Sequence, residues 1–242
     1  MAKILKSKKN NLKKKYRKYR RNSALGFFSL LGVPFYISRL GILPTFFVVL
    51  ILMIIVSVSS RESKKLKSGL DGEMKSTKIL EKLPDKYYIL PNLQIMVDGS
   101  VCEMDHVIVG SNGIFIVESK NHKGIIVGNE NDREFVQHKT GRNGGEYSKT
   151  FYSPIKQVNT HVYKLSQLLK KNGYRQWIVG AVLFTNEQAN IRVRYKSTPV
   201  FSVNENSSKS IVDYIENYES KQRINKDERK LIAECIHRSR IG

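Results

Sequence analysis

The segment 101–120 constrains the fold of this chain more than any other, because it predicts a tight β-hairpin between two buried strands. Runs rich in β-branched residues, 101–109 and 114–120, flank the four residues Gly-Ser-Asn-Gly at 110–113. Glycine and asparagine are favoured in two-residue hairpin turns, and apolar runs beside such a turn are typical of antiparallel strands. The chain is therefore expected to build a sheet around this hairpin.

Three charged side chains of the hairpin fall on one face. A turn centred on 111–112 sets Asp105 opposite Glu118, whereas a turn centred on 112–113 sets it opposite Lys120. Because side chains alternate with a period of two residues, these three share one face in both registers. Two carboxylates and a lysine at the end of apolar strands need a reason to be buried, and a divalent metal ion is a good one. The alternative is an ordinary solvated pair of charges.

The net charge of +21 over 242 residues is unevenly distributed. Residues 1–21 contain eleven lysines and arginines and no acid, whereas residues 69–242 contain 26 basic and 20 acidic residues. The globular part is therefore only mildly basic. A basic tail binds anionic lipid headgroups or nucleic acid, and its position beside an apolar segment favours lipid. Cys102 and Cys235 predict neither a disulfide framework nor a metal knuckle.

The apolar segment predicts an attachment to a membrane. Residues 40–58 are 19 residues without a charge, which is long enough to cross the hydrocarbon core of ~30 Å as a helix. A weaker apolar stretch, 23–38, is either a non-spanning segment or the first arm of a helical hairpin that turns near 39–41. A cleaved signal peptide is the competing interpretation, and the long basic leader argues against it.

The remainder of the chain predicts a mixed sheet flanked by helices. The expected order is helix, three strands, helix and strand, followed by a C-terminal extension. In this interpretation residues 61–68 form a polar linker and residues 128–150 form an irregular, glycine-rich excursion. The expected helices are 70–83, 153–171 and two near the C-terminus, and the expected strands are 87–97, 101–109, 114–120, 177–184 and 199–203.

An Asp followed by Glu-x-Lys on the next strand, within this order of elements, resembles the PD-(D/E)XK nuclease-like superfamily. The version here is similar to the NERD (nuclease-related) domain over about residues 69–190. Two positions depart from its pattern: Phe135 stands where a tryptophan is common, and Ser153 where an asparagine is commoner. The residues that carry the resemblance are Gly72-Glu73, 104–110, 113–121, Gly124, Pro154, Gln157 and 183–186.

The resemblance implies an α/β fold with a restriction-endonuclease-like α-β-β-β-α-β core and a mixed central sheet, preceded by a transmembrane helix or helical hairpin. The domains expected on this basis are a basic tail, a membrane segment, a linker, a NERD-like domain and a C-terminal strand and helical extension. Their expected bounds are 1–22, 23–60, 61–68, 69–190 and 191–242.

The resemblance also implies the chemistry of phosphodiester hydrolysis. Asp105, Glu118 and the main-chain carbonyl of Ser119 would hold Mg²⁺ or Mn²⁺. Lys120 would orient or deprotonate the attacking water and offset charge at phosphorus. Glu73, on the apolar stripe of the first helix, would complete or fix the metal site.

Gln157 opens the second helix and is expected to contact the phosphate or a metal-bound water. For Glu73 the alternative is a first-turn helix acid that is favourable to the helix dipole, and for Gln157 it is a surface amide. His106 and His122 are neighbours of the triad that point to the opposite face, so structural roles are expected for both. His161 lies one turn after Gln157 and is the best histidine candidate for substrate contact.

These features together predict a membrane-anchored, metal-dependent nuclease that acts on DNA more readily than on RNA. The alternative is a catalytically silent nuclease-fold module that binds nucleic acid or a protein partner at the membrane. The positive-inside rule places the basic tail in the cytoplasm, so two spans would place the nuclease domain there and one span would place it outside. A nucleic-acid substrate favours two spans. The lipid bilayer would be contacted through 23–60 and the basic tail.

Overall fold

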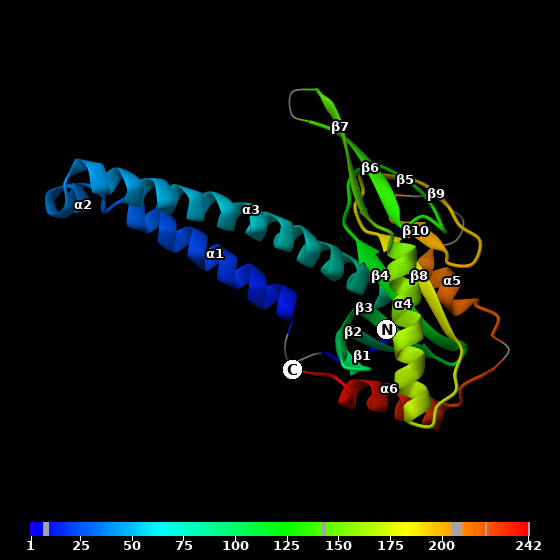
Figure 1. Cartoon of the computed structure of the whole chain (residues 1–242). Coiled ribbons are helices and arrows are strands. Elements are labelled where there is room, and N and C mark those ends of the chain that lie inside the picture. The colour runs from blue at the N-terminus through cyan, green and yellow to red at the C-terminus, as the bar shows by residue number, and fades with distance from the viewer. Residues whose placement is uncertain (7–9, 142–143, 205–209, 221, 242) are drawn as a thin grey trace. The chain divides into compact units, whose positions relative to one another are not determined.

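The computed structural model describes residues 1–6, 10–141, 144–204, 210–220 and 222–241 (Figure 1). The chain divides into two compact units. One unit combines residues 1–9 with residues 72–242, and the other comprises residues 10–71. The short N-terminal segment therefore belongs to the same unit as the C-terminal two thirds of the chain.

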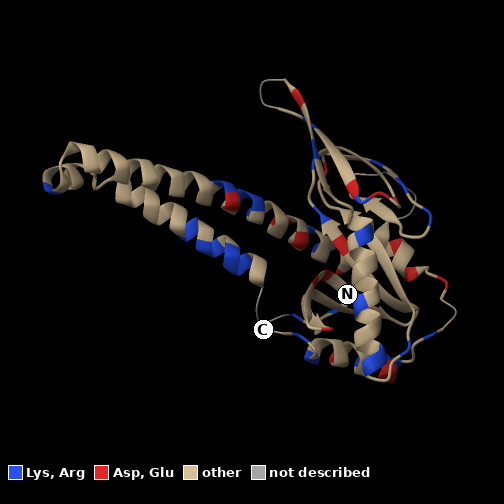
Figure 2. Ribbon diagram, viewed as in Figure 1, with Lys and Arg blue, Asp and Glu red and all other residues tan. Residues whose placement is uncertain are grey.

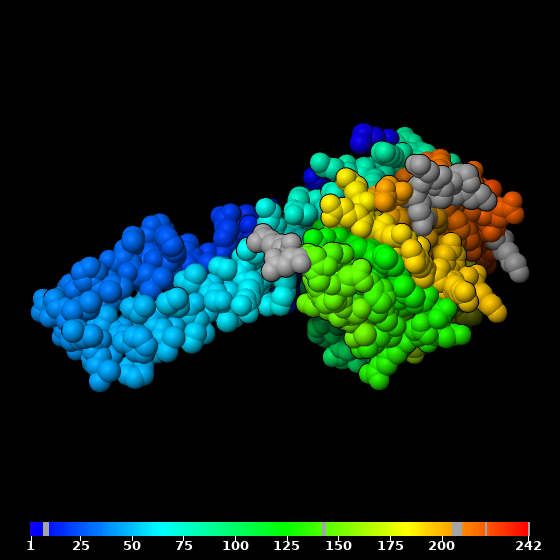
Figure 3. Space-filling model, turned by 90° about the horizontal axis from the view of Figure 1, so that it is seen from above, coloured from blue at the N-terminus to red at the C-terminus, as the bar shows by residue number. Residues whose placement is uncertain are grey.

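The unit 10–71 is a helical hairpin. Helices α1 (Asn11–Leu30) and α2 (Val33–Leu40) are followed, after Gly41 with a φ of 81°, by the long helix α3 (Ile42–Leu80). Helices α1 and α3 lie side by side (Figures 1 and 3), and the hydroxyls of Ser23 and Ser60 are 2.7 Å apart. A Cβ on Gly26 would lie 2.7 Å from Val56, so this glycine permits the close approach of the two helices.

Helix α3 is long and apolar enough to cross a membrane. Only 11% of its most apolar window is buried against the rest of the described chain. Helices α1 and α2 pass the same test together, although they are bent by 60° at their junction. Large apolar side chains such as those of Phe46 and Ile51 are exposed on this helix, and exposed apolar patches of this kind are typical of surfaces that contact a protein partner or a membrane.

Two of the expected segment boundaries were wrong. Residues 61–68 are not a separate linker but part of α3, because this stretch contains neither Gly nor Pro and is rich in residues that favour helices. The basic segment 1–22 is not one tail either. Lys3–Ile4 form strand β1, since Ile4 packs on the core, and α1 begins at Asn11 after an Asn10 cap, with its lysines and arginines along its first half (Figure 2).

The main sheet has six strands in the order β1-β2-β3-β4-β8-β10. The pairs β2–β3 and β3–β4 are antiparallel and all other neighbours are parallel, so the sheet is mixed. The predicted central strand after residue 177 is confirmed as β8, which lies between β4 and β10. The strands are β2 (Tyr88–Val97), β3 (Ser100–Gly110), β4 (Gly113–Lys120), β8 (Ile178–Phe184) and β10 (Val200–Ser202).

A second sheet of four strands, ordered β7-β6-β5-β9, replaces the irregular excursion expected at 128–150. The prediction of an irregular segment was wrong. The sequence did not reveal the strands there because β7 is exposed along most of its length and shows no alternation of apolar and polar residues. The packing of this sheet is nevertheless specific, because a Cβ on Gly128 would lie 2.3 Å from the ring of buried Phe135. The strands are β5 (Gly124–Asn129), β6 (Glu134–Thr140), β7 (Glu146–Tyr152) and β9 (Ala189–Arg194).

Helices cover both faces of the main sheet. Helix α4 (Pro154–Lys171) and helix α6 (Lys226–Arg238) pack on one face through residues such as Val158 and Ile232. The end of α3 and helix α5 (Ile211–Glu216) pack on the other face. The fold is therefore mixed α/β, and its elements follow the predicted order α3-β2-β3-β4-α4-β8 except that strands β5 to β7 of the second sheet are inserted before α4. Residues Ile114 and Ile116 face α4, and this alternation carries Glu118 to the same face.

Candidate active site

The hairpin β3–β4 takes the first of the two registers that the sequence allows. Gly110 pairs with Gly113 and His106 pairs with Val117, so the same register carries Asp105 to the position beside Glu118. Asn112 in the turn is buried and holds it in place: its Nδ2 donates to the carbonyl of Ile215 at 2.5 Å. The local turn therefore decides which charged groups meet.

Glu118 is the buried centre of the site. Its side chain is 2% exposed, and its Oε1 accepts a hydrogen bond of 2.7 Å from the Nζ of Lys120. Burial raises the pKa of the Glu118 carboxyl to about 8, and the negative charges of Asp105 and Glu73 act in the same direction. The charge of Lys120 opposes this shift without cancelling it. A carboxylate is thus held where its charge is costly, which is typical of functional sites.

The second oxygen of Glu118 faces a neutral imidazole. Oε2 lies 3.4 Å from the Nδ1 of His161, and neither atom has a hydrogen bond. Burial lowers the pKa of His161 to about 4, so the ring carries no charge at neutral pH. These two buried atoms face each other without a hydrogen bond, so they are positioned to share a proton or to bind a cation.

Asp105 is held by the strand that carries Glu118. The main-chain N–H of Ser119 donates to its Oδ2 at 2.8 Å, and the Ser119 hydroxyl donates to the same oxygen at 2.9 Å. Strict alternation is interrupted here, because Met104 and Val107 both pack on the α4 side of the sheet. The partner strand β2 bends at the same level, where Asn92 has a φ of 50°. This irregularity sets where the Asp105 carboxylate points.

Helix α4 brings Gln157 to the site. Ser153 caps the helix by accepting from the main-chain N–H of Lys156, and Pro154 occupies its first position, as predicted. The Oε1 of Gln157 in this first turn accepts a hydrogen bond of 2.9 Å from the Nζ of Lys120. Lys120 is therefore fixed between Glu118 and Gln157, and Gln157 is not an isolated surface amide.

Helix α3 brings Glu73 within electrostatic reach of the site, since its charge contributes to the raised pKa of Glu118. The idea that Glu73 is a first-turn helix acid was wrong, because α3 begins at Ile42, far upstream. On the same helix, Thr77 contacts the opposite face of β3: its hydroxyl lies 2.9 Å from Nε2 of His106.

His106 and His122 lie where structural roles were expected. His106 is buried on the α3 side of the sheet, and burial lowers its pKa. The ring of His122 packs on Phe151 with a centroid distance of 4.3 Å. Burial, together with the charges of Lys120 and Lys139, lowers the pKa of His122 to about 4. Neither ring contacts Glu118 among the contacts described.

Comparison with known proteins identifies this region. The family model of the nuclease-related domain, NERD, matches residues 68–185. The chain contains a nuclease-related domain. All of the predicted site residues, from Glu73 to Gln157, lie inside the matched segment. The resemblance on which the sequence prediction relied is thereby confirmed.

A relative of the nuclease-related domain is an uncharacterized protein of Bacillus anthracis. It is 30% identical over 107 residues, which cover 43% of this chain and 47% of the relative. The chain thus spans about half the length of this curated relative. No solved structure matches the chain significantly.

The side chains of the nuclease-related domain have the chemistry to hold a divalent cation. Within the described ranges, no group of three or more His, Cys, Asp or Glu side chains is arranged around a common ion position. Mg²⁺, however, is commonly held by one or two carboxylates together with waters and substrate phosphates. Asp105 and Glu118 supply two carboxylates, and Oε2 of Glu118 is buried without a hydrogen-bond partner. These residues therefore fit such an ion.

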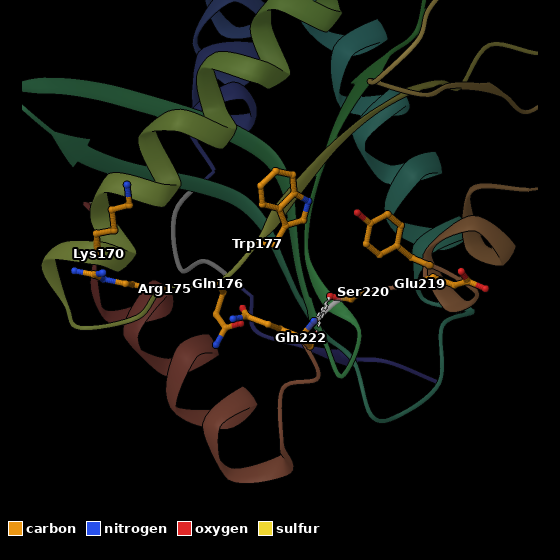
Figure 4. Close-up of a pocket in the computed structure, with 8 residues that line it drawn as sticks. Lys170, Arg175, Gln176, Trp177, Glu219, Ser220 and Gln222 are labelled. Carbon is orange, nitrogen blue, oxygen red and sulfur yellow. Dashed lines mark hydrogen bonds between the residues drawn. The ribbon is translucent and has the colours of Figure 1, made fainter.

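A pocket of about 780 Å³ lies at the opposite end of β8 from this site (Figure 4). Trp177 precedes β8, and its carbonyl accepts a hydrogen bond from the main-chain N–H of Ile114 at the start of β4. Lys120 pairs with Phe184 at the other end of the two strands. Six residues of strand separate the two ends by roughly 20 Å. None of the predicted site residues lines this pocket, which is formed by Lys170, Arg175, Gln176, Trp177, Tyr218, Glu219, Ser220 and Gln222.

The sequence missed two contacts of the site. His161 was predicted only to contact the substrate, and its position beside Glu118 was not foreseen. The spacing of one helical turn, which puts His161 and Gln157 on one face of α4, was the available signal. The hydroxyl of Ser119 bound to Asp105 was not foreseen, because strict alternation would turn it to the other face of the strand.

Proposed function

We propose that this protein is a membrane-anchored, metal-dependent nuclease that hydrolyses phosphodiester bonds, with DNA preferred over RNA. The observation that carries the proposal is the buried Glu118, whose raised pKa results from burial and from the nearby charges of Asp105 and Glu73. A carboxylate that is charged at this position destabilises the fold, and a function that requires the charge explains why it is there. The nuclease-related domain supports the choice of reaction.

The architecture supports a restriction-endonuclease-like core. Apart from strands β5 to β7 of the second sheet, which are inserted between β4 and α4, the elements follow one another as α3-β2-β3-β4-α4-β8, and β8 lies parallel beside β4. Asp105 lies on β3, Glu118 and Lys120 lie on β4, and Gln157 lies on the crossover helix α4. We place this core within residues 69–190, with a C-terminal extension over 191–242.

The proposed metal set is Asp105, Glu118 and the main-chain carbonyl of Ser119, with Glu73 as a further carboxylate. A bound Mg²⁺ or Mn²⁺ would lower the pKa of a water molecule and offset the charge of the phosphate. Binding the ion would require Glu118 in its charged form. A cation beside this carboxylate would favour that form and so offset the effect of burial that raises its pKa.

Lys120 is the proposed catalytic group that contacts the water and the phosphate. Its Nζ is part-buried, and it donates to Glu118 and Gln157, which leaves its third proton for the substrate. Gln157 positions this ammonium group through its Oε1. His161 lies beside Glu118 as a neutral ring, so it adds no positive charge that would repel a metal ion from this carboxylate.

Residues 23–60 are proposed to cross the membrane as a hairpin, with the nuclease domain in the cytoplasm. Strand β1 pairs in parallel with β2, with Lys3 beside Tyr88 and Ile4 beside Ile89. This pairing supports an even number of crossings, because an N-terminal segment that pairs with the nuclease-related domain would lie on the same side of a membrane as that domain. The basic residues of α1 favour the cytoplasmic side.

The test is divalent-dependent cleavage of labelled DNA and RNA by the purified full chain. The variants Asp105→Asn and Lys120→Met are expected to lose at least 100-fold in rate, since each removes a proposed metal ligand or a group that contacts the reacting phosphate. Glu103→Gln is the matched control, because this carboxylate is exposed and lies on the same strand. Equal rates for Lys120→Met and the wild type would reject the proposal.

A catalytically silent module is the second candidate. The observation in its favour is that several polar groups of the site already pair with one another: Ser119 donates to Asp105, and Lys120 donates to Glu118 and Gln157. These three interactions need no metal ion. Divalent binding seen by calorimetry, together with no cleavage of DNA or RNA, would favour this candidate over the enzyme.

A further inference from the structure

Three lysines gather on one face of the second sheet, close to the candidate active site. Strands β6 and β7 are antiparallel, with Lys139 opposite Tyr147 and Gln137 opposite Lys149. Since directly opposite residues share a face and side chains alternate, Lys139, Tyr147 and Lys149 lie on the same face as Gln137. The outer part of this β-hairpin extends from the body of the sheet (Figure 1).

A third lysine joins this face at its base. The Nε2 of Gln137 donates a hydrogen bond of 2.7 Å to the carbonyl of Lys123, which ties the loop before β5 to β6. Lys139 lies against the same loop, since its Cγ is 3.5 Å from the position that a Cβ on Gly124 would take. We call Lys123, Lys139 and Lys149 the lysine strip.

The charges of the lysine strip are not neutralised by the protein. None of the three lysines forms an ion pair within the described ranges, and Lys123 and Lys149 are exposed. Burial lowers the pKa of Lys139, and the positive charges of Lys149 and Lys123 lower it further. Placing like charges together destabilises a sheet, so the arrangement has a cost in the free protein.

Protection of a sheet edge explains only part of the lysine strip. Lysines on edge strands prevent edge-to-edge aggregation, and Lys149 lies on the edge strand β7. Lys139 lies on β6, between β7 and β5, and Lys123 lies in a loop, so neither protects an edge. A polyanionic ligand is the simpler explanation for all three.

The lysine strip is continuous with the candidate active site. The ring of His122 is close enough to both Lys120 and Lys139 for the two charges to lower its pKa. His122 in turn packs on Phe151 at the base of β7. His122 therefore lies within electrostatic reach of both Lys120 of the site and Lys139 of the strip.

We propose that the lysine strip binds the phosphate backbone of the nucleic-acid strand whose scissile bond lies at Lys120. This inference rests on the proposed nuclease function and adds to it the surface that holds the substrate beyond the scissile phosphate. Tyr147 supports a nucleic acid over other polyanions, because its ring is 45% exposed and a base can stack on such a ring. Lys149 lies over the same ring, 5.8 Å from its centroid, so a cation and an aromatic surface are presented together.

The test is the salt dependence of nucleic-acid binding by the full chain. All chains carry Asp105→Asn to prevent cleavage, and binding to a labelled oligonucleotide is measured by anisotropy between 50 and 200 mM salt. The test variant changes Lys123, Lys139 and Lys149 to Ser. The control variant changes Lys170, Lys171 and Lys230 to Ser, which removes the same charge from exposed positions elsewhere.

Loss of three phosphate contacts is expected to reduce the slope of log Kd against log salt by about 2 to 3. The chain with an intact strip should therefore lose about 20- to 40-fold more affinity than the strip variant over this fourfold change in salt. The basic residues of α1 bind equally in every chain, so they do not affect the difference. A Lys→Arg triple variant should keep the original slope.

An unchanged slope in the strip variant, equal to that of the control, would overturn the inference. If the Ser triple variant does not fold, Lys149→Ser alone should reduce the slope by about 1, and no reduction there would overturn it as well. Cleavage by the wild type with an unchanged slope would refute the strip and leave the nuclease proposal intact. A reduced slope without any cleavage would refute the nuclease and leave the strip as a binding surface.

Discussion

Replacing Glu118 by Gln is expected to stabilise the nuclease-related domain in the absence of metal ions, although it should abolish cleavage. The side chain is only 2% exposed, and its pKa is raised to about 8 from an ordinary value near 4.5. Gln has nearly the same shape, carries no charge to desolvate, and can still accept the hydrogen bond from Lys120. The variant therefore removes a cost of the folded state while it keeps the packing.

The magnitude follows from linkage between protonation and folding. Because the pKa of Glu118 is raised in the folded state, the free energy of unfolding is highest below about pH 4.5, where this carboxyl is protonated in both states. The free energy of unfolding then falls as the pH rises towards 8. Each pH unit in this window costs about 1.4 kcal/mol. At pH 7 the accumulated cost is roughly 3 kcal/mol, and Glu118→Gln should recover most of it.

The assay is urea unfolding of the detergent-solubilised full chain, with the folded fraction of the domain read by pulse proteolysis in EDTA. The wild type should lose stability between pH 5 and pH 8, whereas the pH profile of Glu118→Gln should lack this component. Addition of Mg²⁺ should stabilise the wild type and leave the variant unchanged. A variant that is less stable than the wild type at pH 7, with the same dependence on pH, would refute the reasoning.

Three further predictions concern the groups that hold the site. Gln157→Ala should lower kcat about 10- to 100-fold with little effect on KM, because it frees the ammonium group that its Oε1 positions; cleavage kinetics test this, and an unchanged kcat would contradict it. Gly110→Ala should cost about 2 kcal/mol or more, because the new Cβ would lie 2.2 Å from the ring of Tyr87; urea unfolding tests this, with Gly145→Ala, in open space, as a neutral control. Asn112→Ala should cost roughly 2 to 3 kcal/mol in the same assay, because it leaves the buried Tyr87 hydroxyl without its acceptor.

The parts of the site that could be predicted from the sequence are those set by local signals. The turn at 110–113 fixed two candidate registers, and both put Asp105, Glu118 and Lys120 near one another. The Ser153 cap and the following proline located the start of α4, and one helical turn places Gln157. Each of these signals lies within a few residues of the group that it positions.

The second sheet could not be predicted, because its pairing is not local. Strand β5 pairs in parallel with β9, which begins about 60 residues later in the chain, at Ala189. Strand β7 is exposed and shows no alternation that would reveal a buried face. The φ of 50° at Asn92, which accompanies the interrupted alternation at Asp105, likewise gives no signal beyond the residue type.

The continuous helix α3 illustrates a different limit of the sequence. A change from apolar to charged residues near Arg61 was interpreted as the end of one element and the start of a linker. Backbone conformation does not follow polarity, however, and nothing in 61–68 ends a helix. The change in composition near Arg61 is therefore not accompanied by a change in secondary structure.

The charges of the nuclease-related domain are separated in a way that one kind of ligand would relieve. Burial and the negative charges of Asp105 and Glu73 raise the pKa of Glu118, whereas burial and the positive charges of Lys149 and Lys123 lower the pKa of Lys139, so like charges are grouped around each of these two residues. If stability alone had arranged these groups, acids and lysines would pair with one another. A phosphodiester accompanied by a divalent cation supplies positive charge to the carboxylates and negative charge to the lysines at once. The two clusters are thus best explained as two halves of one binding site for a metal-associated nucleic acid.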